Sequence, residues 1–257
     1  YFIIILFILF FLSVIKIYQM PHLILVRHGQ SEWNLEKRFT GWVDVDLTGQ
    51  GKLEACKAGE YVKKIKININ HFYSSFQLRA IKTLKLIQET LRDQTTPIRA
   101  WQLNERHYGS LTGLNKDQMK EKLGEEKIHE FRRSWDIKPE PLNKNNPYHP
   151  LNIEIYKNIP KENIPDTESL KDTYERVMKF YDNEIQDKLQ NNENILISAH
   201  GNSIRALCKF LFKLDNDKIS LLEIPTGNPL LINLDKELNI KECFYLDKER
   251  AKDLLVF

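Results

Sequence analysis

Two short apolar runs that each end next to a His-Gly dipeptide constrain the fold of this chain more than any other feature. Residues 23–26 (LILV) are followed within two positions by His28, and residues 194–199 (NILISA) are followed directly by His200. A third short run, HFYSS, covers residues 71–75. Apolar runs of this length, bounded by polar residues or glycine, are typical of strands buried on both faces of a sheet.

Amphipathic helical patterns lie between these runs. In residues 169–189 the apolar side chains recur on one stripe, and Ser169 stands three residues before Asp172 as a predicted helix cap. Similar patterns cover residues 48–62 and 80–91. Alternating strands and helices predict an α/β fold, a single-domain three-layer sandwich whose mostly parallel sheet carries helices on both faces.

Two segments depart from this alternation. Residues 137–166 contain six prolines and several asparagines, so we expect an irregular excursion that lies near a functional site. Residues 1–19 are an apolar extension that is short for a membrane span and lacks the basic start of a secretory signal. Because Met20 precedes the first strand, we interpret residues 1–19 as upstream sequence read through and residues 20–257 as the folded domain. A membrane anchor is the alternative.

Charge and cysteine content narrow the function classes. The 38 basic and 35 acidic side chains give a formal net charge of +3, which does not require a nucleic-acid partner. Cys56, Cys208 and Cys243 have no C-x-x-C spacing, so neither a disulfide scaffold nor a zinc knuckle is indicated. We expect a reducing compartment and no bound metal.

The two histidines predict one common site. Ligands of parallel α/β sheets bind beyond the carboxyl ends of the strands, so His28 and His200 should face the same crevice. Either histidine alone is more consistent with a structural role, but the matching pair weakens that interpretation. Planar guanidinium groups bind phosphate oxygens, so several arginines that converge on this crevice would bind a small polyanion. The alternative is that these arginines are scattered over the surface and solvated. The candidate arginines are Arg27, Arg79, Arg106, Arg132 and Arg133.

The opening motif carries a resemblance to a known family. LVRHGQSEWN, followed by RFTGWVDVDLTGQG, resembles the histidine phosphatase superfamily, and the continuation is similar to its cofactor-dependent phosphoglycerate mutases. The later segments that match in order are NERHYGSLTGLNK, EFRRSWDIKPEPL, TESL, SAHGNSIRAL and IPTGNPL, so the resemblance runs from about residue 23 to residue 246. It implies a metal-independent enzyme of glycolysis and gluconeogenesis that interconverts 3- and 2-phosphoglycerate, with 2,3-bisphosphoglycerate as its cofactor and minor synthase and phosphatase activities.

The resemblance also implies catalytic roles for five residues. His28 corresponds to the nucleophile that forms a phosphohistidine, which divides one difficult transfer into two steps. Arg27, Arg79 and His200 correspond to groups that neutralise the transferring phosphoryl oxygens, and Glu105 to the acid and base for the substrate hydroxyl.

Further matched positions are expected to bind substrate. A mutase binds a bisphosphate in two orientations, so it needs cations beyond the reacting phosphate, and this requirement favours a mutase over a phosphatase. Serine at position 31 is similar to the glycolytic mutases, whereas the red-cell bisphosphoglycerate mutases have glycine there. The expected substrate-binding residues are Ser31, Asn34, Thr40, Gly41, Arg106, Tyr108, Lys116, Arg132, Arg133 and Asn202.

Other interpretations stay open beside this one. They are a broad-specificity histidine phosphatase and a noncatalytic phosphate-binding protein tethered by residues 1–18. Gln77 and Leu78 differ from the residues common in the family, so we expect altered packing before Arg79. Eleven residues follow Leu246, so we expect a truncated form of the tail of longer family members, and faster hydrolysis of the phosphohistidine relative to transfer than in those members. We expect phosphoglycerates as the partners, a homodimer or homotetramer, a cytoplasmic location, and no membrane contact unless residues 1–18 belong to the protein.

Overall fold

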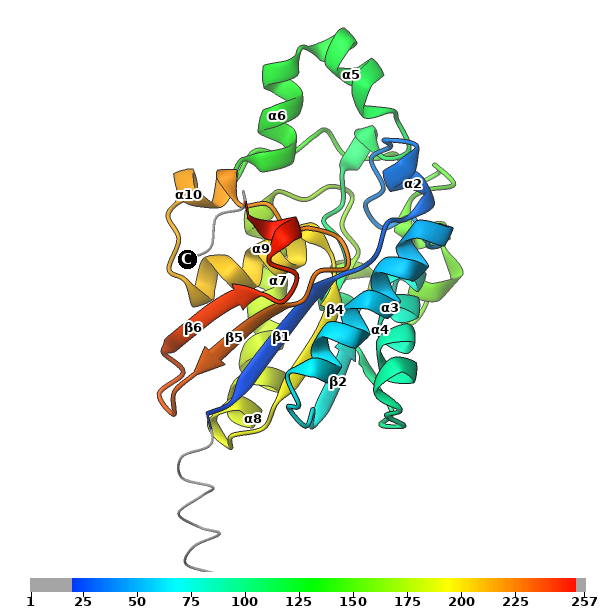
Figure 1. The fold of residues 1–257 in the computed structure, drawn as a ribbon. Coiled ribbons are helices and arrows are strands. Elements are labelled where there is room, and N and C mark those ends of the chain that lie inside the picture. Colours follow the sequence, from blue (N-terminus) through cyan, green and yellow to red (C-terminus); the bar gives the residue numbers. More distant parts are fainter. Residues whose placement is uncertain (1–19, 253–257) are drawn as a thin grey trace, which may run out of the picture.

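A six-stranded sheet forms the centre of the computed structural model, which describes residues 20–252 (Figure 1). The predictions about residues 1–19, and the last five residues of the chain, lie outside the described residues. In spatial order the strands are β3 (Ile98–Arg99), β2 (His71–Ser74), β4 (Ile195–Ala199), β1 (His22–Arg27), β5 (Leu230–Leu234) and β6 (Ile240–Tyr245).

The sheet is mixed, with its parallel part in the middle and at one edge. The pairs β1–β4, β2–β4 and β2–β3 are parallel, whereas β1–β5 and β5–β6 are antiparallel. The three strands expected from the apolar runs are β1, β2 and β4, and the α/β class is confirmed. Strands β3, β5 and β6 were not predicted.

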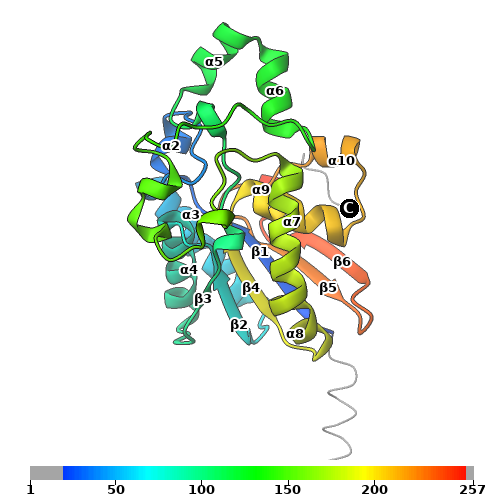
Figure 2. The same cartoon turned by 180° about the vertical axis from the view of Figure 1, so that it is seen from behind.

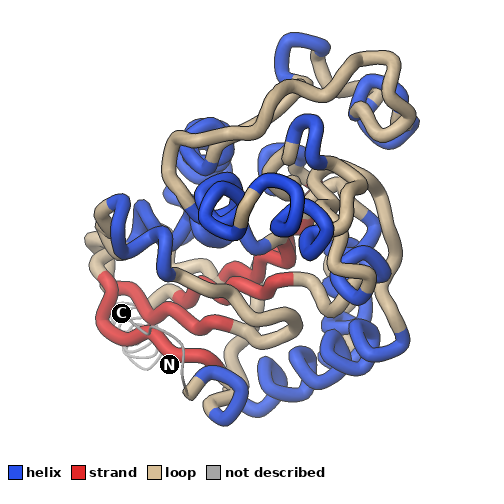
Figure 3. The backbone as a smooth tube through the Cα atoms, turned by 90° about the horizontal axis from the view of Figure 1, so that it is seen from above, coloured by secondary structure: helices blue, strands red, loops and turns tan. Residues whose placement is uncertain are grey.

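Helices cover both faces of the sheet. On one face α3 (Gly49–Lys64) and α4 (Leu78–Leu91) lie over β1 and β4, and on the other lie α7 (Leu170–Phe180), α8 (Gln186–Gln190) and α9 (Gly201–Leu211), as Figures 1 and 2 show from opposite sides. Viewed from above in Figure 3, the strands run between the two helical layers.

Alternation along the strands produces two separate cores. Leu23 and Leu25 of β1 pack with the α7 and α9 side, whereas Ile24 and Val26 pack with the α3 and α4 side. All four side chains are buried. Because successive side chains of a strand point to opposite faces, a strand covered on both sides must be apolar at every position.

Local capping explains where two of the helices begin. The Thr48 hydroxyl accepts a hydrogen bond from the Gly51 amide at the start of α3, and Ser169 forms the predicted capping box with Asp172 at the start of α7. The helical stripe expected over residues 169–189 is not one α-helix. It contains a π-helical turn at Tyr181–Ile185 between α7 and α8.

Two further parts lie beyond the carboxyl ends of the parallel strands. Helices α5 (Lys116–Leu123) and α6 (Glu125–Arg133) project above the sheet in Figure 1, near the short helices α2 (Glu32–Leu35) and α10 (Asn216–Leu221). Residues 137–166 form turns and three 3₁₀ helices, Pro150–Asn152, Glu154–Tyr156 and Lys161–Asn163. Other 3₁₀ helices are Trp101–Leu103, Gly109–Leu111 and Glu249–Ala251. None of the helices between residues 20 and 252 has the length and apolar character needed to cross a bilayer.

Candidate active site

The two histidines lie side by side at the ends of neighbouring parallel strands. His28 follows β1 and His200 follows β4, and the His28 amide donates to the Ala199 carbonyl at 3.0 Å. Their ring centroids are 4.9 Å apart. The topology thus brings together two residues that are far apart in the sequence.

His28 has the protonation state that a nucleophile requires. Its Nδ1 lies 2.7 Å from the Gly29 carbonyl, which can only accept, so Nδ1 carries the proton and Nε2 presents a lone pair. Burial holds the pKa of His28 well below its usual range, and the charges of Arg79 and Arg27 lower it further. The ring is therefore neutral at pH 7.

His200 is held in the same neutral state. Burial is the largest cause that lowers its pKa, and the positive charges of Arg79 and Arg27 lower it further. Its Nε2 lies 2.7 Å from the Ser75 hydroxyl, which follows β2. His28, His200 and Ser75 thus follow three adjacent strands of the sheet, β1, β4 and β2.

Two arginines flank the histidines: Arg79 is buried and Arg27 is half-buried. Arg27 donates through Nη1 to the Ile224 carbonyl at 2.8 Å, while its Nε has no hydrogen-bond partner among residues 20–252. Arg79 donates to the carbonyls of Val43 and Gly41 at 2.9 and 3.0 Å. A buried donor without a partner is costly, so the Arg27 Nε is a ready contact for an anion.

Glu105 has one carboxylate oxygen fixed by the protein and one free. Oε1 accepts from the Arg106 amide at 2.8 Å, and from the amide and side-chain nitrogen of Asn202 at 3.2 and 2.8 Å. Within the described residues no hydrogen bond reaches Oε2. This oxygen is therefore free to exchange a proton with a bound hydroxyl group.

These groups surround a cavity of about 130 Å³, well below the roughly 300–1,000 Å³ of a typical drug-sized site. Six cationic side chains and two carboxylates line it. Burial lowers the pKa of Lys116, and the nearby charges of Arg132 and Arg27 lower it further, as expected where cations are crowded. The cavity is suited to a small molecule with several negative charges. The lining residues are Arg27, His28, Asn34, Thr40, Gly41, Arg79, Glu105, Tyr108, Lys116, Arg132, Arg133, Gly201, Asn202, Arg205, Glu223 and Ile224.

Three of the expected site residues do not line the cavity. His200 lies behind it against His28, and the buried Ser31 caps α2 by accepting from the Asn34 amide at 3.3 Å. The Arg106 guanidinium lies over the Tyr108 ring, 4.7 Å from its centroid, and donates to the Phe131 carbonyl at 2.6 Å. Ser31 and Arg106 thus support neighbouring residues in this structure rather than contacting the cavity.

Gln77, where altered packing was expected, takes a central structural position. It is fully buried, its side-chain nitrogen donates to the Gly41 carbonyl at 2.8 Å, and its Oε1 accepts from the Glu105 amide at 2.9 Å. Gln77 therefore joins the loop that Arg79 also contacts to the segment that carries Glu105. Leu78, the other residue expected to alter this packing, is the first residue of α4.

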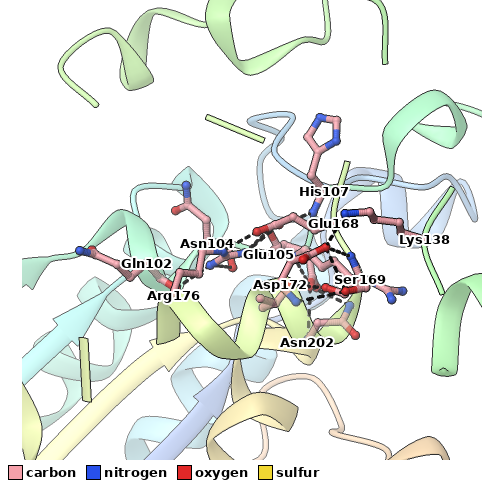
Figure 4. Close-up of polar contacts among 12 residues, drawn as sticks. Gln102, Asn104, Glu105, His107, Lys138, Glu168, Ser169, Asp172, Arg176 and Asn202 are labelled. Carbon is pink, nitrogen blue, oxygen red and sulfur yellow. Dashed lines mark hydrogen bonds and ion pairs between the residues drawn. The ribbon is translucent and has the colours of Figure 1, made fainter. Parts of the chain in front are cut away.

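A second support of Glu105 was not predicted from the sequence. Arg176 of α7 donates to Glu168 from Nε at 2.7 Å and from Nη2 at 3.0 Å, and Nη2 also donates to the Glu105 carbonyl at 3.0 Å (Figure 4). Nη1 reaches the carbonyls of Gln102 and Asn104. Glu168 lies in the matched segment TESL, just before the Ser169 cap of α7, and no local sequence pattern pairs it with Arg176.

Arg205 of α9 was also missed, although it lies in the matched segment SAHGNSIRAL. It donates to Asn202 Oδ1 at 2.9 Å and to the carbonyls of Arg132 and Arg133 at 3.5 and 3.1 Å. It therefore ties the end of α6, which carries two of the cavity cations, to the residue that holds Glu105. Among residues 20–252 no group of three His, Cys, Asp or Glu side chains is placed to hold a metal ion.

Comparison with known proteins gives this geometry a family. The sequence profile of the histidine phosphatase superfamily (branch 1) matches residues 23–239, and the chain belongs to that superfamily. Among the solved structures that share the fold are mycobacterial hydrolase 1 (TM-score 0.64, 20% identity, covering 86% of this chain and 96% of that one) and Bacillus stearothermophilus YhfR (TM-score 0.61, 21% identity, covering 86% of this chain and 94% of that one).

Curated relatives narrow the assignment within the superfamily. A 2,3-bisphosphoglycerate-dependent phosphoglycerate mutase of Pelagibacter ubique (strain HTCC1062) is 84% identical over 238 residues, which are 93% of this chain and 100% of that protein. One of Caulobacter sp. (strain K31) is 49% identical, over 91% of this chain and 98% of that protein. The resemblance to the cofactor-dependent phosphoglycerate mutases is confirmed.

Proposed function

We propose that this protein is a 2,3-bisphosphoglycerate-dependent phosphoglycerate mutase that interconverts 3- and 2-phosphoglycerate in glycolysis and gluconeogenesis. The observation that carries the proposal is the set of cations around one small cavity. Arg27 and Arg79 lie beside His28, and Lys116, Arg132 and Arg133 line the same cavity, which provides for a second anionic group on one ligand. The names of the curated relatives agree with it.

The proposed chemistry begins at His28. 2,3-Bisphosphoglycerate, when bound, supplies the phosphoryl group that primes the enzyme. Nε2 of His28 attacks phosphorus, so that an N–P bond forms while the P–O bond to the leaving oxygen breaks. Arg27 and Arg79 offset the charge on the phosphoryl oxygens, which is the main requirement of phosphoryl transfer. The free Nε of Arg27 and the crowded cations fit a small polyanion.

Glu105 would move the substrate proton in both directions. Its Oε2 donates a proton to the oxygen that leaves phosphorus, and in the return step it removes the proton from the attacking hydroxyl. Asn202 and the Arg106 amide fix Oε1 throughout, so proton exchange is confined to one oxygen. His200, neutral and next to His28, would stabilise the transferring group.

Assembly and location belong to the same proposal. We propose a homodimer or homotetramer, supported by the exposed Ile98 on the edge strand β3, and light scattering on a sizing column tests it. We also propose a cytoplasmic location, catalysis without a metal, and minor synthase and phosphatase activities.

Turnover tests the central proposal. Conversion of 3-phosphoglycerate to 2-phosphoglycerate is measured in a chelator, with and without a catalytic amount of 2,3-bisphosphoglycerate. We expect turnover that survives the chelator and increases with the bisphosphate. Hydrolysis of phosphate esters without mutase turnover would instead identify a phosphatase.

A further inference from the structure

One of the cavity cations already has an anionic partner from the protein. The Arg133 guanidinium contacts the Glu223 carboxylate, and Arg133 Nη1 also donates to the Leu222 carbonyl at 3.2 Å. Both side chains line the cavity. The Arg133 side chain is 20% exposed and that of Glu223 is 60% exposed, so the carboxylate stands at the open side of the pair.

Glu223 is the only cavity carboxylate, among the described residues, without a part in the proposed chemistry. Glu105 is the other, and its Oε1 is held by Asn202. The charge of Glu223 also extends to the phosphate side of the cavity. Burial lowers the pKa of Arg27, and the charges of Glu105 and Glu223 oppose that lowering. An anion in the cavity is therefore repelled by Glu223 at the same time as it is attracted by the arginines.

The backbone around Glu223 is held without its carboxylate. The Ile224 carbonyl accepts from Arg27 at 2.8 Å, and the Glu223 carbonyl accepts from the Tyr245 hydroxyl at 3.4 Å. Removal of the side-chain charge should therefore leave the course of this segment unchanged. The carboxylate acts through its charge and its contact with Arg133.

We propose that Glu223 is a specificity-determining residue that competes with the ligand for Arg133. This inference rests on the proposed function, because it concerns the second anionic group of a bisphosphate in the same cavity. That group must displace Glu223 to reach Arg133, whereas a single phosphate at His28 need not. Glu223 therefore weakens binding of the bisphosphate selectively and replaces it on Arg133 when the ligand leaves or reorients.

Equilibrium binding tests the competition without turnover. In the full chain with His28→Ala, calorimetry measures the Kd of 2,3-bisphosphoglycerate and of inorganic phosphate, with and without Glu223→Gln. We expect Glu223→Gln to tighten the bisphosphate about fivefold to tenfold and phosphate less than about twofold, since one repelling charge is lost near the second group. An unchanged or weaker bisphosphate affinity would overturn the proposal.

Two matched variants separate charge from packing. Glu175→Gln removes the same charge from an exposed position on α7 outside the cavity and should leave both affinities unchanged. Glu223→Asp keeps the charge and should stay within about twofold of the parent. If Glu223→Asp instead behaved like Glu223→Gln, packing rather than charge would control the affinity and the proposal would fail.

Mutase turnover of the wild-type chain, measured in parallel, distinguishes a failure of this inference from a failure of the proposed function. If the wild-type chain shows mutase turnover but Glu223→Gln leaves the bisphosphate affinity unchanged, only this inference is rejected. Absence of both turnover and bisphosphate binding rejects the proposed function and this inference with it.

Discussion

Arg176 offers the sharpest test of how the fold positions Glu105. Its guanidinium donates to both oxygens of Glu168 and to the carbonyls of Gln102, Asn104 and Glu105. The side chains of Arg176 and Glu168 are only 9% and 5% exposed. Arg176→Met would leave the Glu168 charge buried without its partner and three carbonyls without a donor.

The expected loss follows from that burial. Removal of one partner from a buried, hydrogen-bonded ion pair costs about 3–5 kcal/mol of the free energy of unfolding. For a domain of this size, about 1 kcal/mol shifts Tm by roughly 2–4 °C, so a decrease of roughly 6–20 °C is expected. The kcat of the remaining folded protein should also fall, because Arg176 holds the Glu105 carbonyl.

Urea and thermal unfolding of four proteins measure the effect: wild type, Arg176→Met, Glu168→Gln and the double variant. The double variant should recover part of the stability that Arg176→Met loses, since it no longer contains the unpaired carboxylate. Lys85→Met, which breaks an exposed 3.8 Å ion pair with Glu89, should leave the transition unchanged. A loss below about 1 kcal/mol in Arg176→Met, or no recovery in the double variant, would refute this reasoning.

Three further predictions concern pH and two single positions. In the folded protein burial is the main cause that lowers the pKa of three histidines: His28 and His200 lie well below the usual value, and His107 lies at about 3. In the unfolded chain the same histidines bind protons below about pH 6.5. The free energy of unfolding should therefore fall as the pH drops below about 6.5, by up to about 1.4 kcal/mol per pH unit for each histidine. A free energy of unfolding that stays constant from pH 7.5 to 5 would contradict this prediction. In Gly109→Ala the new Cβ would lie 2.1 Å from the Glu140 carbonyl oxygen, in a backbone with φ of +53°. The free energy of unfolding measured in urea should therefore fall by at least about 2 kcal/mol, and an unchanged value would refute the close contact. Gln77→Leu leaves the Glu105 amide unpaired and should lower kcat about tenfold in a protein with an unchanged circular dichroism spectrum, whereas unaltered turnover would remove Gln77 from the support of Glu105.

The central strands and their helices could be predicted because their signals are local. β1 and β4 are buried on both faces, so each is a continuous apolar run, and α3 and α7 begin at residues whose side chains cap them. β3 has only two residues, both exposed, and β6 carries Lys241 and Glu242, so neither produces such a run. The π-helical turn at Tyr181–Ile185 keeps the apolar stripe and is invisible to a periodicity argument.

In the candidate active site, too, only the features with a local sequence signal could be predicted. His28 and His200 were predicted to lie together because parallel strands end at one edge of the sheet. The contacts that support Glu105 depend on pairs distant in sequence: Arg176 reaches a carbonyl 74 residues away, and Gln77 reaches an amide 28 residues away. No local pattern encodes such a pairing. Glu223 was missed for the same reason, since its partner Arg133 lies 90 residues before it.

Detection of a phosphohistidine tests the central claim most directly. The protein is mixed with 2,3-bisphosphoglycerate, quenched under alkaline conditions that preserve phosphohistidine, and mapped by mass spectrometry, with His28→Ala as the control. We predict one phosphoryl group on His28, absent from the variant and lost when 3-phosphoglycerate is added. A phosphoryl group at another residue, or undiminished labelling of His28→Ala, would contradict the assignment of the nucleophile and the mechanism built on it.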